Sequence, residues 1–307
     1  NRGFKSEIVF DINDFMGEST CVGCGECVQA CPTGALMPSK EVALNTPDKK
    51  VESVCPYCGV GCLLTYNVKD EKILFAEGRD GPSNLSRLCV KGRYGFDYIH
   101  NDGRLTKPLI RKQGVDKNID LHSYDFNNIN EIFEETTWEH ALDVAIEGFK
   151  KVKKSKGPSG LAGFGCAKGS NEEAYLFQKL IRTGFDTNNV DHCTRLCHAS
   201  SVVALLEMVG SGAVSNQVAD VTEAEVIIII GSNPTVNHPV AATFMKNASK
   251  EGKTLIVMDP KKTDISRHAN YYLQFKPDTD VAMLNAIMKS IIDQDLVDKE
   301  FIKTRTK

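Results

Sequence analysis

The chain has 307 residues, with 37 Lys and Arg against 40 Asp and Glu, and its formal net charge is −3 at pH 7. Its 41% hydrophobic and 25% charged residues are typical of a globular protein with two or three domains and exclude a collagen-like or disordered chain. Because charges of both signs are interspersed, neither nucleic acid nor an anionic membrane surface is predicted as a partner. No run of about 18 apolar residues occurs, so we predict no membrane span.

Cysteine is the unusual residue type, because the chain contains 11 and eight of them fall between Cys21 and Cys89. The spacings are too short for many disulfide bridges, and no signal-like apolar segment is seen at the start. Clustered thiols therefore indicate metal sites in a reducing compartment, and we expect a cytoplasmic protein.

The first 50 residues contain a C-x2-C-x2-C-x3-C-P run, formed by Cys21, Cys24, Cys27 and Cys31. This spacing is typical of the ferredoxin loop that binds a [4Fe–4S] cluster, and a zinc site is the weaker alternative. In two-cluster ferredoxins the fourth cysteine of such a run binds the partner cluster, whose own quartet is missing here. Residues 1–50 are predicted to be half of a ferredoxin-like domain that continues before Asn1, with 46–50 as a linker.

Residues 51–108 are predicted to form a small β-rich domain around a second quartet of cysteines, Cys55, Cys58, Cys62 and Cys89. Their C-x2-C-x3-C-x26-C spacing predicts a separate [4Fe–4S] cluster, with zinc as the alternative. Short strands are expected at 63–68 and 72–76 around a polar turn, and a helix at 90–100.

The rest of the chain has the alternating pattern of an open parallel α/β domain. Residues 109–137 show no clear periodicity and are interpreted as a connector, and the α/β domain is expected over 138–307. Helices are predicted at 138–154, 171–183, 239–250 and 280–293, and strands at 160–164, 226–230, 254–258 and 271–275. Because the strands are uninterrupted apolar runs, we expect helices on both faces of the sheet.

Small and polar residues follow these strands, where nucleotides bind in open α/β sheets. These segments contain Gly231, Ser232, Asn233, Asn237, Asp259, Pro260, Lys261 and Asp280, whose binding roles depend on the family resemblance given below. The loop after residue 230 is not a G-x-G-x-x-G sequence, so a plain NAD site is not favoured.

The sequences CPYCGVGC at 55–62 and RLCVKGR at 87–93 resemble the iron–sulfur domain of bis-molybdopterin oxidoreductases. The resemblance implies that Lys91 lies between the cluster and one pterin, where its positive charge favours reduced neighbours. It also implies that the strand-end loops bind the guanine dinucleotide, with Asp259 accepting hydrogen bonds from the guanine or ribose. The family often has Arg where Lys261 stands, so a forked contact is replaced here by a point charge.

Cys197 and His198 are the candidate catalytic residues. By spacing alone Cys197 is as readily a structural thiol, but the segment 187–202 resembles the active site of molybdenum or tungsten formate dehydrogenases. There a Cys or selenocysteine binds the metal and the following His handles a proton, roles that suit a soft thiolate and an imidazole. Periplasmic nitrate reductases typically have Met at the second position, so His198 favours formate. Cys166 is interpreted as structural, and no role is derived for Cys193.

The resemblance implies a catalytic subunit of the soluble NAD-linked type, which oxidises formate reversibly to CO2 with bis-molybdopterin guanine dinucleotide and Mo or W. Flavin and iron–sulfur subunits of the diaphorase type are the expected partners. The substrate-orienting Arg of such enzymes is expected beyond Lys307, so the 307 residues alone are predicted to be inactive. Two alternatives stay open: a nitrate reductase of the same family, and a non-catalytic iron–sulfur electron-transfer subunit of an NADH-oxidising complex.

Overall fold

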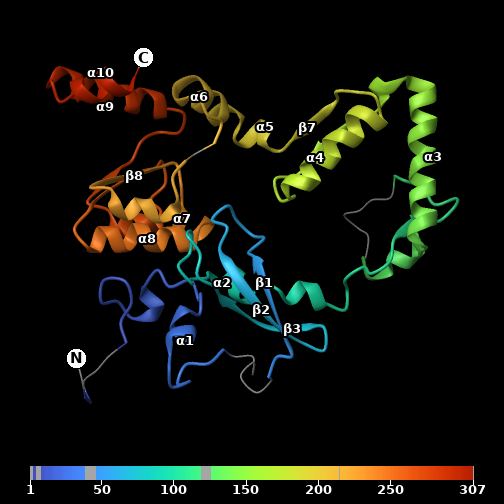
Figure 1. Cartoon of the computed structure of the whole chain (residues 1–307), viewed down its shortest axis with the longest axis horizontal. Coiled ribbons are helices and arrows are strands. Elements are labelled where there is room, and N and C mark those ends of the chain that lie inside the picture. The colour runs from blue at the N-terminus through green and yellow to red at the C-terminus, as the bar shows by residue number, and fades with distance from the viewer. Residues whose placement is uncertain (1–2, 5–7, 39–45, 119–125, 214, 307) are drawn as a thin grey trace. The chain divides into compact units, whose positions relative to one another are not determined.

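The computed structural model describes residues 3–4, 8–38, 46–118, 126–213 and 215–306 (Figure 1). The chain divides into two compact units, the first formed by Asn1–Asp97 with Asn216–Lys307 and the second by Tyr98–Ser215. It combines a small antiparallel sheet with short parallel sheets and helices, as expected for a mixed α/β protein. None of the helices described is both long enough and apolar enough to cross a membrane.

The N-terminal part of the first unit is mostly loop, and its regular elements are η1 (Met16–Glu18) and α1 (Glu26–Ala30). Gly25 precedes α1 with a φ of 75°, a backbone conformation that glycine adopts without steric cost. The chain therefore turns sharply between Cys24 and α1.

A three-stranded antiparallel sheet follows, in the order β1-β2-β3, made of β1 (Lys49–Val54), β2 (Leu63–Lys69) and β3 (Lys72–Gly78). The two predicted strands are confirmed, and their turn has positive φ at Asp70 and Glu71. The linker prediction at 46–50 was wrong at its end, because β1 begins at Lys49. This strand is almost wholly exposed, so it lacks the apolar alternation from which a strand is predicted.

The helix predicted at 90–100 is divided into α2 (Val90–Tyr94) and η3 (Asp97–His100). Gly95 ends α2, and its N–H donates to the carbonyl of Lys91 at 2.8 Å. Its own carbonyl accepts a hydrogen bond from the hydroxyl of Tyr57. The division leaves α2 as a short helix held at its end by the loop of the second cysteine quartet.

The second unit begins at Tyr98 and contains the segment 109–137, which the sequence predicted to be an irregular connector. That prediction was wrong in part, because β4 (Leu109–Arg111) and β5 (Phe133–Glu135) pair as an antiparallel ribbon and η4 (Phe126–Glu131) precedes β5. The guanidinium of Arg111 lies 5.0 Å from the ring centre of Phe133 across this ribbon. Residues 119–125 of the predicted connector lie outside the described residues.

The remaining second-unit elements are helical apart from one parallel pair of strands. They are α3 (Trp138–Lys156), η5 (Pro158–Gly160), β6 (Gly163–Gly165), α4 (Asn171–Lys179), η6 (Leu180–Gly184), β7 (Val190–His192), α5 (Thr194–Cys197) and α6 (Ala199–Val209). Thr137 caps α3 by accepting the N–H of His140, and Ser170 and Glu173 form a capping box at α4. In the helix predicted at 171–183, the α-helical part ends at Lys179 and a π-helical turn follows it. The strand predicted at 160–164 is found at Gly163–Gly165 instead.

The C-terminal part of the first unit is a parallel sheet of order β10-β9-β8 with its helices (Figure 1). Its elements are η7 (Val218–Glu223), β8 (Val226–Ile230), α7 (Pro234–Asn237), α8 (Pro239–Lys250), β9 (Thr254–Met258), η8 (Asp264–His268), β10 (Tyr271–Leu273), α9 (Asp280–Asp293) and α10 (Lys299–Arg305). The predicted bounds of β8, β9, α8 and α9 are confirmed, and β10 ends two residues earlier than expected.

In the described residues, one face of β8 is packed and its other face is exposed. Ile227 and Ile229 of β8 are buried with Ala248 of α8, whereas the alternate residues Ile228 and Val226 are more than half exposed. The expectation of helices on both faces is therefore wrong for this structure. The sequence of β8 could not distinguish the two cases, because a strand made of isoleucines has the same apolar pattern whether one or both of its faces are packed.

Candidate metal centre and cofactor site

The second cysteine quartet is gathered around the start of the antiparallel sheet. Cys55 follows β1, Cys58 lies in the next loop, Cys62 precedes β2 and Cys89 caps α2. The N–H of Cys55 donates to the carbonyl of Cys62 at 2.9 Å, which closes the loop that carries Cys58. Local backbone geometry thus places three thiols on one tight loop and brings the fourth from α2.

These thiols belong to the apolar core of the first unit. Cys55, Cys62 and Cys89 are buried in one cluster with Leu64, Leu88, Val240 and Phe244, and Cys58 packs against it. The pKa of Cys62 is raised to about 12, mainly by burial and in addition by the neighbouring thiols of Cys55, Cys58 and Cys89. A bare thiolate is therefore unfavourable at Cys62, and bound iron would supply the positive charge that stabilises it. This donor set fits a [4Fe–4S] cluster.

Within the described residues, no three His, Cys, Asp or Glu side chains surround a point suited to a single metal ion. A cubane cluster makes a different demand, because each thiolate binds an iron atom at its own corner.

Lys91 and Gly92 lie on α2 immediately after Cys89. A Cβ atom at Gly92 would lie 3.5 Å from the sulfur of Cys55, so this helix passes directly against the thiol site. The side chain of Lys91 is exposed. Lys91 therefore immediately precedes Gly92, the residue of α2 that faces the second quartet.

The first quartet is divided by the structure. Cys21, Cys24 and Cys27 line a cavity of about 470 Å³ with residues of α7 and α8, whereas Cys31 is not among its lining residues. Burial raises the pKa of Cys24, while a hydrogen bond with the Thr33 hydroxyl and nearby backbone N–H groups lowers the pKa of Cys31 to about 7. Three thiols in one cavity fit three corners of a cluster, in keeping with the ferredoxin spacing.

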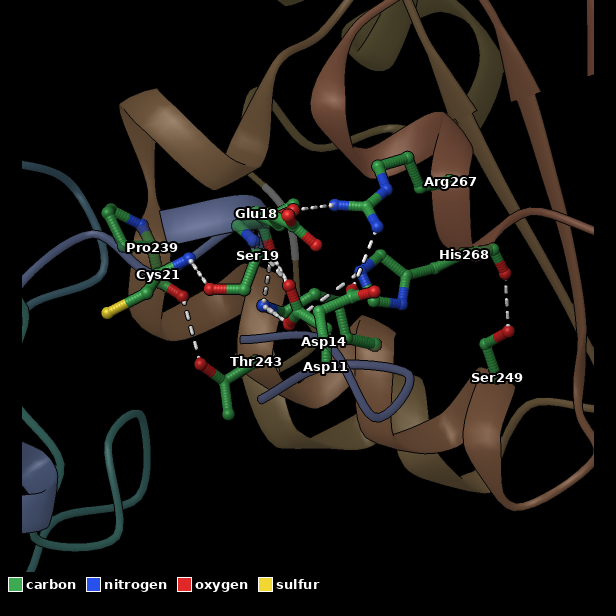
Figure 2. Close-up of polar contacts among 12 residues, drawn as sticks. Asp11, Asp14, Glu18, Ser19, Cys21, Pro239, Thr243, Ser249, Arg267 and His268 are labelled. Carbon is green, nitrogen blue, oxygen red and sulfur yellow. Dashed lines mark hydrogen bonds and ion pairs between the residues drawn. The ribbon is translucent and has the colours of Figure 1, made fainter. Parts of the chain in front are cut away.

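An N-terminal anchor, formed by Asp11, Thr20 and Lys246, holds this loop against α8. Figure 2 labels Asp11 with its neighbours Asp14, Arg267 and His268. Asp11 accepts hydrogen bonds from the hydroxyl of Thr20 at 2.7 Å and from Lys246 at 3.2 Å. Burial alone would raise the pKa of Asp11, but the Thr20 and Lys246 hydrogen bonds lower it to about 2. Close by, Arg267 donates to Asp14 at 2.8 Å and to the carbonyl of Glu18 at 3.0 Å. The sequence alone gave no signal for these contacts.

The predicted nucleotide loops lie at one edge of the parallel sheet. Ile230, Met258 and Leu273 stand side by side at the carboxyl ends of the three strands. The N–H of Gly231 donates to Met258 at 3.0 Å, and Gly231 has a φ of 59° that favours glycine. The structure therefore brings the loops that begin at Gly231 and at Asp259 together.

Unpartnered polar atoms mark this edge. The side-chain oxygens of Asn233, Thr235 and Thr263 are buried and find no hydrogen-bond partner among the residues that the structure describes. Buried polar atoms are usually satisfied, so these oxygens are suited to a polar ligand such as a nucleotide. Donors and acceptors of the kind found in the guanine dinucleotide of a molybdopterin would fit them.

The other predicted residues of this site are placed as follows. Asp259 accepts the N–H of Lys261 at 2.7 Å, its carbonyl accepts the hydroxyl of Tyr272, and the carbonyl of Pro260 accepts from Gln274. Ser232 is half-buried, and the side chains of Asn237 and Lys261 are exposed. Asp280 begins α9, and no hydrogen bond or ion pair of the described residues joins it to the loops.

Cys197 and His198 belong to the second unit. Cys197 ends α5, His198 precedes α6, and both side chains are exposed. The N–H of His198 donates to the carbonyl of Thr194 at 2.9 Å, which fixes the turn between the two helices. Cys193 lies 3.8 Å from a ring nitrogen of His192, and Cys166 accepts the N–H of Lys168.

Three comparisons with known proteins agree with this arrangement. Residues 104–303 match the model of the molybdopterin oxidoreductase family, residues 48–101 its Fe4S4 domain and residues 17–37 a 4Fe-4S binding domain. The chain therefore belongs to the molybdopterin oxidoreductases, and its domains imply a 4Fe–4S cluster and a molybdopterin cofactor. The family predicted from the cysteine motifs is confirmed.

Among curated relatives, a "Putative formate dehydrogenase" of Staphylococcus aureus strain MRSA252 is 35% identical over 338 residues, which cover 96% of this chain and 33% of the relative. The protein of the same description from strain bovine RF122 / ET3-1 gives the same identity and coverage. The chain thus spans about a third of the length of these relatives.

Among solved structures, "Acetylene Hydratase from Pelobacter acetylenicus" superposes with a TM-score of 0.65 at 23% identity, covering 83% of this chain and 33% of that one. This similarity concerns the fold.

Proposed function

We propose that this chain forms part of the catalytic subunit of a formate dehydrogenase, which converts formate to CO2, two electrons and a proton, or the reverse. The observation that carries the proposal is the 35% identity to proteins described as formate dehydrogenases, which extends over 96% of the chain. In fold terms, the proposal comprises half of a ferredoxin-like domain, a [4Fe–4S] domain and a Rossmann-like cofactor domain.

Cys197 and His198 are the residues proposed to act at the substrate. Molybdenum or tungsten held by two molybdopterin guanine dinucleotides supplies two-electron redox chemistry when bound, and the soft thiolate of Cys197 suits it as a ligand. The imidazole of His198 is a general base of the kind that accepts protons in enzymes, and it is suited to accept the proton that formate oxidation releases. Their exposure is compatible with access for a ligand and a small anion.

The first unit is proposed to bind the redox groups. The two sets of cysteines would hold [4Fe–4S] clusters, and Lys91 would place a positive charge beside the second one. The loops with Asn233 and Asp259 would bind the guanine nucleotide, a role that the buried, unpartnered oxygen of Asn233 supports. A cytoplasmic location and partner subunits of the diaphorase type, with flavin and iron–sulfur centres, complete the proposal.

The proposal is tested with the complete enzyme that contains this chain, loaded with its metal and assayed for formate-dependent reduction of a viologen dye. Formate oxidation is expected, and the Cys197→Ser variant should lose at least 99% of it, while Cys193→Ser serves as the matched control. Nitrate reduction by reduced viologen, without formate oxidation, would instead identify a nitrate reductase. A complete enzyme without molybdenum or tungsten would favour the electron-transfer subunit.

A further inference from the structure

Arg93 is a buried cation between the two cysteine sets. It lies on α2, four residues after Cys89, and its side chain is only 7% exposed. A buried guanidinium needs several hydrogen-bond partners, because desolvation of the charge is otherwise costly. Its partners come from another segment of the chain.

The guanidinium of Arg93 donates to three groups of the first cysteine loop. Its Nε donates to the carbonyl of Cys24 at 2.8 Å, one terminal nitrogen donates to the side-chain oxygen of Gln29 at 2.6 Å, and the other pairs with the carboxylate of Glu26. These contacts join residues more than sixty positions apart in the sequence. One side chain therefore binds both the first and the last part of α1.

Glu26 and Gln29 also bind the backbone of the domain that carries the second cysteine set. The same carboxylate oxygen of Glu26 accepts the N–H of Leu88 at 2.8 Å, directly before Cys89. The side chain of Gln29 accepts the N–H of Gly78 at 3.2 Å and donates to the carbonyl of Ser86. Two groups of hydrogen bonds thus join the two parts: Arg93 of α2 binds the first cysteine loop, and side chains of α1 bind the segment that ends at Cys89.

Two glycines allow the surfaces to approach. A Cβ atom at Gly25 would lie 2.6 Å from Cδ of Arg93 and would also overlap the hydroxyl of Tyr94. On the other side of Arg93, a Cβ atom at Gly92 would lie 3.5 Å from the sulfur of Cys55. Helix α2 is therefore in van der Waals contact with the loop of the first set and with a thiol of the second.

We propose that Arg93 is a positioning residue that locks the two cluster-binding loops together and so fixes the path for electron transfer between their clusters. The inference rests on the proposed assignment of both cysteine sets as [4Fe–4S] ligands. The transfer moves one electron, oxidising one cluster and reducing the other, and it makes or breaks no covalent bond. Because electron tunnelling falls steeply with distance, a rigid contact keeps it fast, and the buried positive charge beside Cys24 favours reduction of the first cluster.

The test uses the complete, cluster-loaded protein, purified without oxygen and reduced with dithionite. Three quantities are measured. They are the iron content, the magnetic interaction between the reduced clusters in electron paramagnetic resonance, and the midpoint potential of the first cluster. The variants are Arg93→Gln, Arg93→Lys and Glu26→Gln. The matched control is Arg79→Gln, because Arg79 lies in the same domain and pairs with Glu52 instead.

Arg93→Gln is expected to keep its iron, weaken the magnetic interaction and lower the midpoint potential. Arg93→Lys should restore the potential, because the charge returns, but not the interaction, because a point charge cannot replace the fork. Arg79→Gln should match the parent. A parent without magnetic interaction, or an Arg93→Gln variant that matches the parent in both measurements, would overturn the proposal.

If Arg93→Gln loses iron, the Glu26→Gln variant provides the test of the proposal. Its amide oxygen still accepts the N–H of Leu88, and only the negative charge that pairs with Arg93 is removed. A weakened interaction with retained iron then supports the proposal, and an unchanged interaction overturns it. Dithionite makes these readouts independent of the substrate, so a protein that does not oxidise formate still tests the role of Arg93.

Discussion

The carboxylate of Asp11 lies 3.2 Å from the ammonium group of Lys246, although the two residues are 235 positions apart in the sequence. Both side chains are mostly withdrawn from solvent, with exposed fractions of 9% and 19%. The pair, with Thr20, forms the N-terminal anchor that fixes the loop of Cys21, Cys24 and Cys27 against α8. Removal of one partner leaves the other charge partly buried and unpaired.

Asp11→Ala is expected to lower the free energy of unfolding by about 2 kcal/mol at pH 7, because Lys246 and Thr20 lose their shared partner. Urea unfolding of the 307-residue chain measures the change. The matched control is Asp293→Ala, whose partner Lys289 lies on the surface of α9, with both side chains more than half exposed. That variant should change stability by less than about 0.5 kcal/mol. Equal effects of the two substitutions would show that the anchor adds no stability.

The anchor should also weaken in acid. The pKa of Asp11 is lowered from 3.8 to about 2 in the folded chain, so its stabilising effect is complete above about pH 4 and is lost as the pH falls toward 2. The difference in stability between the parent and Asp11→Asn is therefore expected to shrink between pH 4 and pH 2. Urea unfolding of the cluster-free chain across this range provides the measurement. A difference in stability that stays constant from pH 4 to pH 2 would show that the charge of Asp11 does not stabilise the fold.

Gly25→Ala is expected to disrupt the first cysteine loop. The residue has a φ of 75°, and the added Cβ would overlap Arg93 and Tyr94. Gly23→Ala is a close control, because Gly23 also has a positive φ of 62° but has no atom within 4 Å of such a Cβ. Left-handed backbone strain of about 1–2 kcal/mol applies to both, so the difference isolates the overlap. Iron bound after reconstitution should fall further in Gly25→Ala than in Gly23→Ala; equal losses would contradict this.

The local parts of the site were predictable because their signals are local. Cysteine spacing predicted both thiol sets, and the bounds of β8, β9, α8 and α9 followed from apolar runs with flanking Gly and Pro. Arg93 stood inside a motif that identified the family, but its partners Glu26 and Gln29 are more than sixty residues away, and no periodicity pairs them. The exposed strand β1 and the uncovered face of β8 were missed for a related reason, since burial depends on tertiary neighbours.

Cys55→Ser is expected to remove one cluster. Cys55 is buried with Cys62 and Cys89, and a hydroxyl is a poor replacement for a thiolate iron ligand. Iron content per chain should fall by the content of one cluster, and the absorbance of iron–sulfur charge transfer should fall with it. Cys166→Ser, at an exposed thiol of the second unit, is the control and should keep the parental iron content. Unchanged iron in Cys55→Ser would refute the assignment of this quartet.

Asn233→Ala tests whether the sheet edge binds a nucleotide. The side-chain oxygen of Asn233 is buried without a hydrogen-bond partner in the described structure, so its removal breaks no hydrogen bond of the described residues. The stability of the cofactor-free chain should therefore change by less than about 0.5 kcal/mol.

The loaded protein should behave differently, because a hydrogen bond to the cofactor would be lost, which is worth about 1 kcal/mol, or roughly a fivefold weaker affinity. Guanine nucleotide released by acid hydrolysis is measured after extensive dialysis. Asn247→Ala, at an exposed position of α8, is the matched control and should retain the parental nucleotide content. Because Asn233 is proposed to contact the nucleotide and Asn247 is not, equal retention in the two variants would exclude Asn233 from the binding edge.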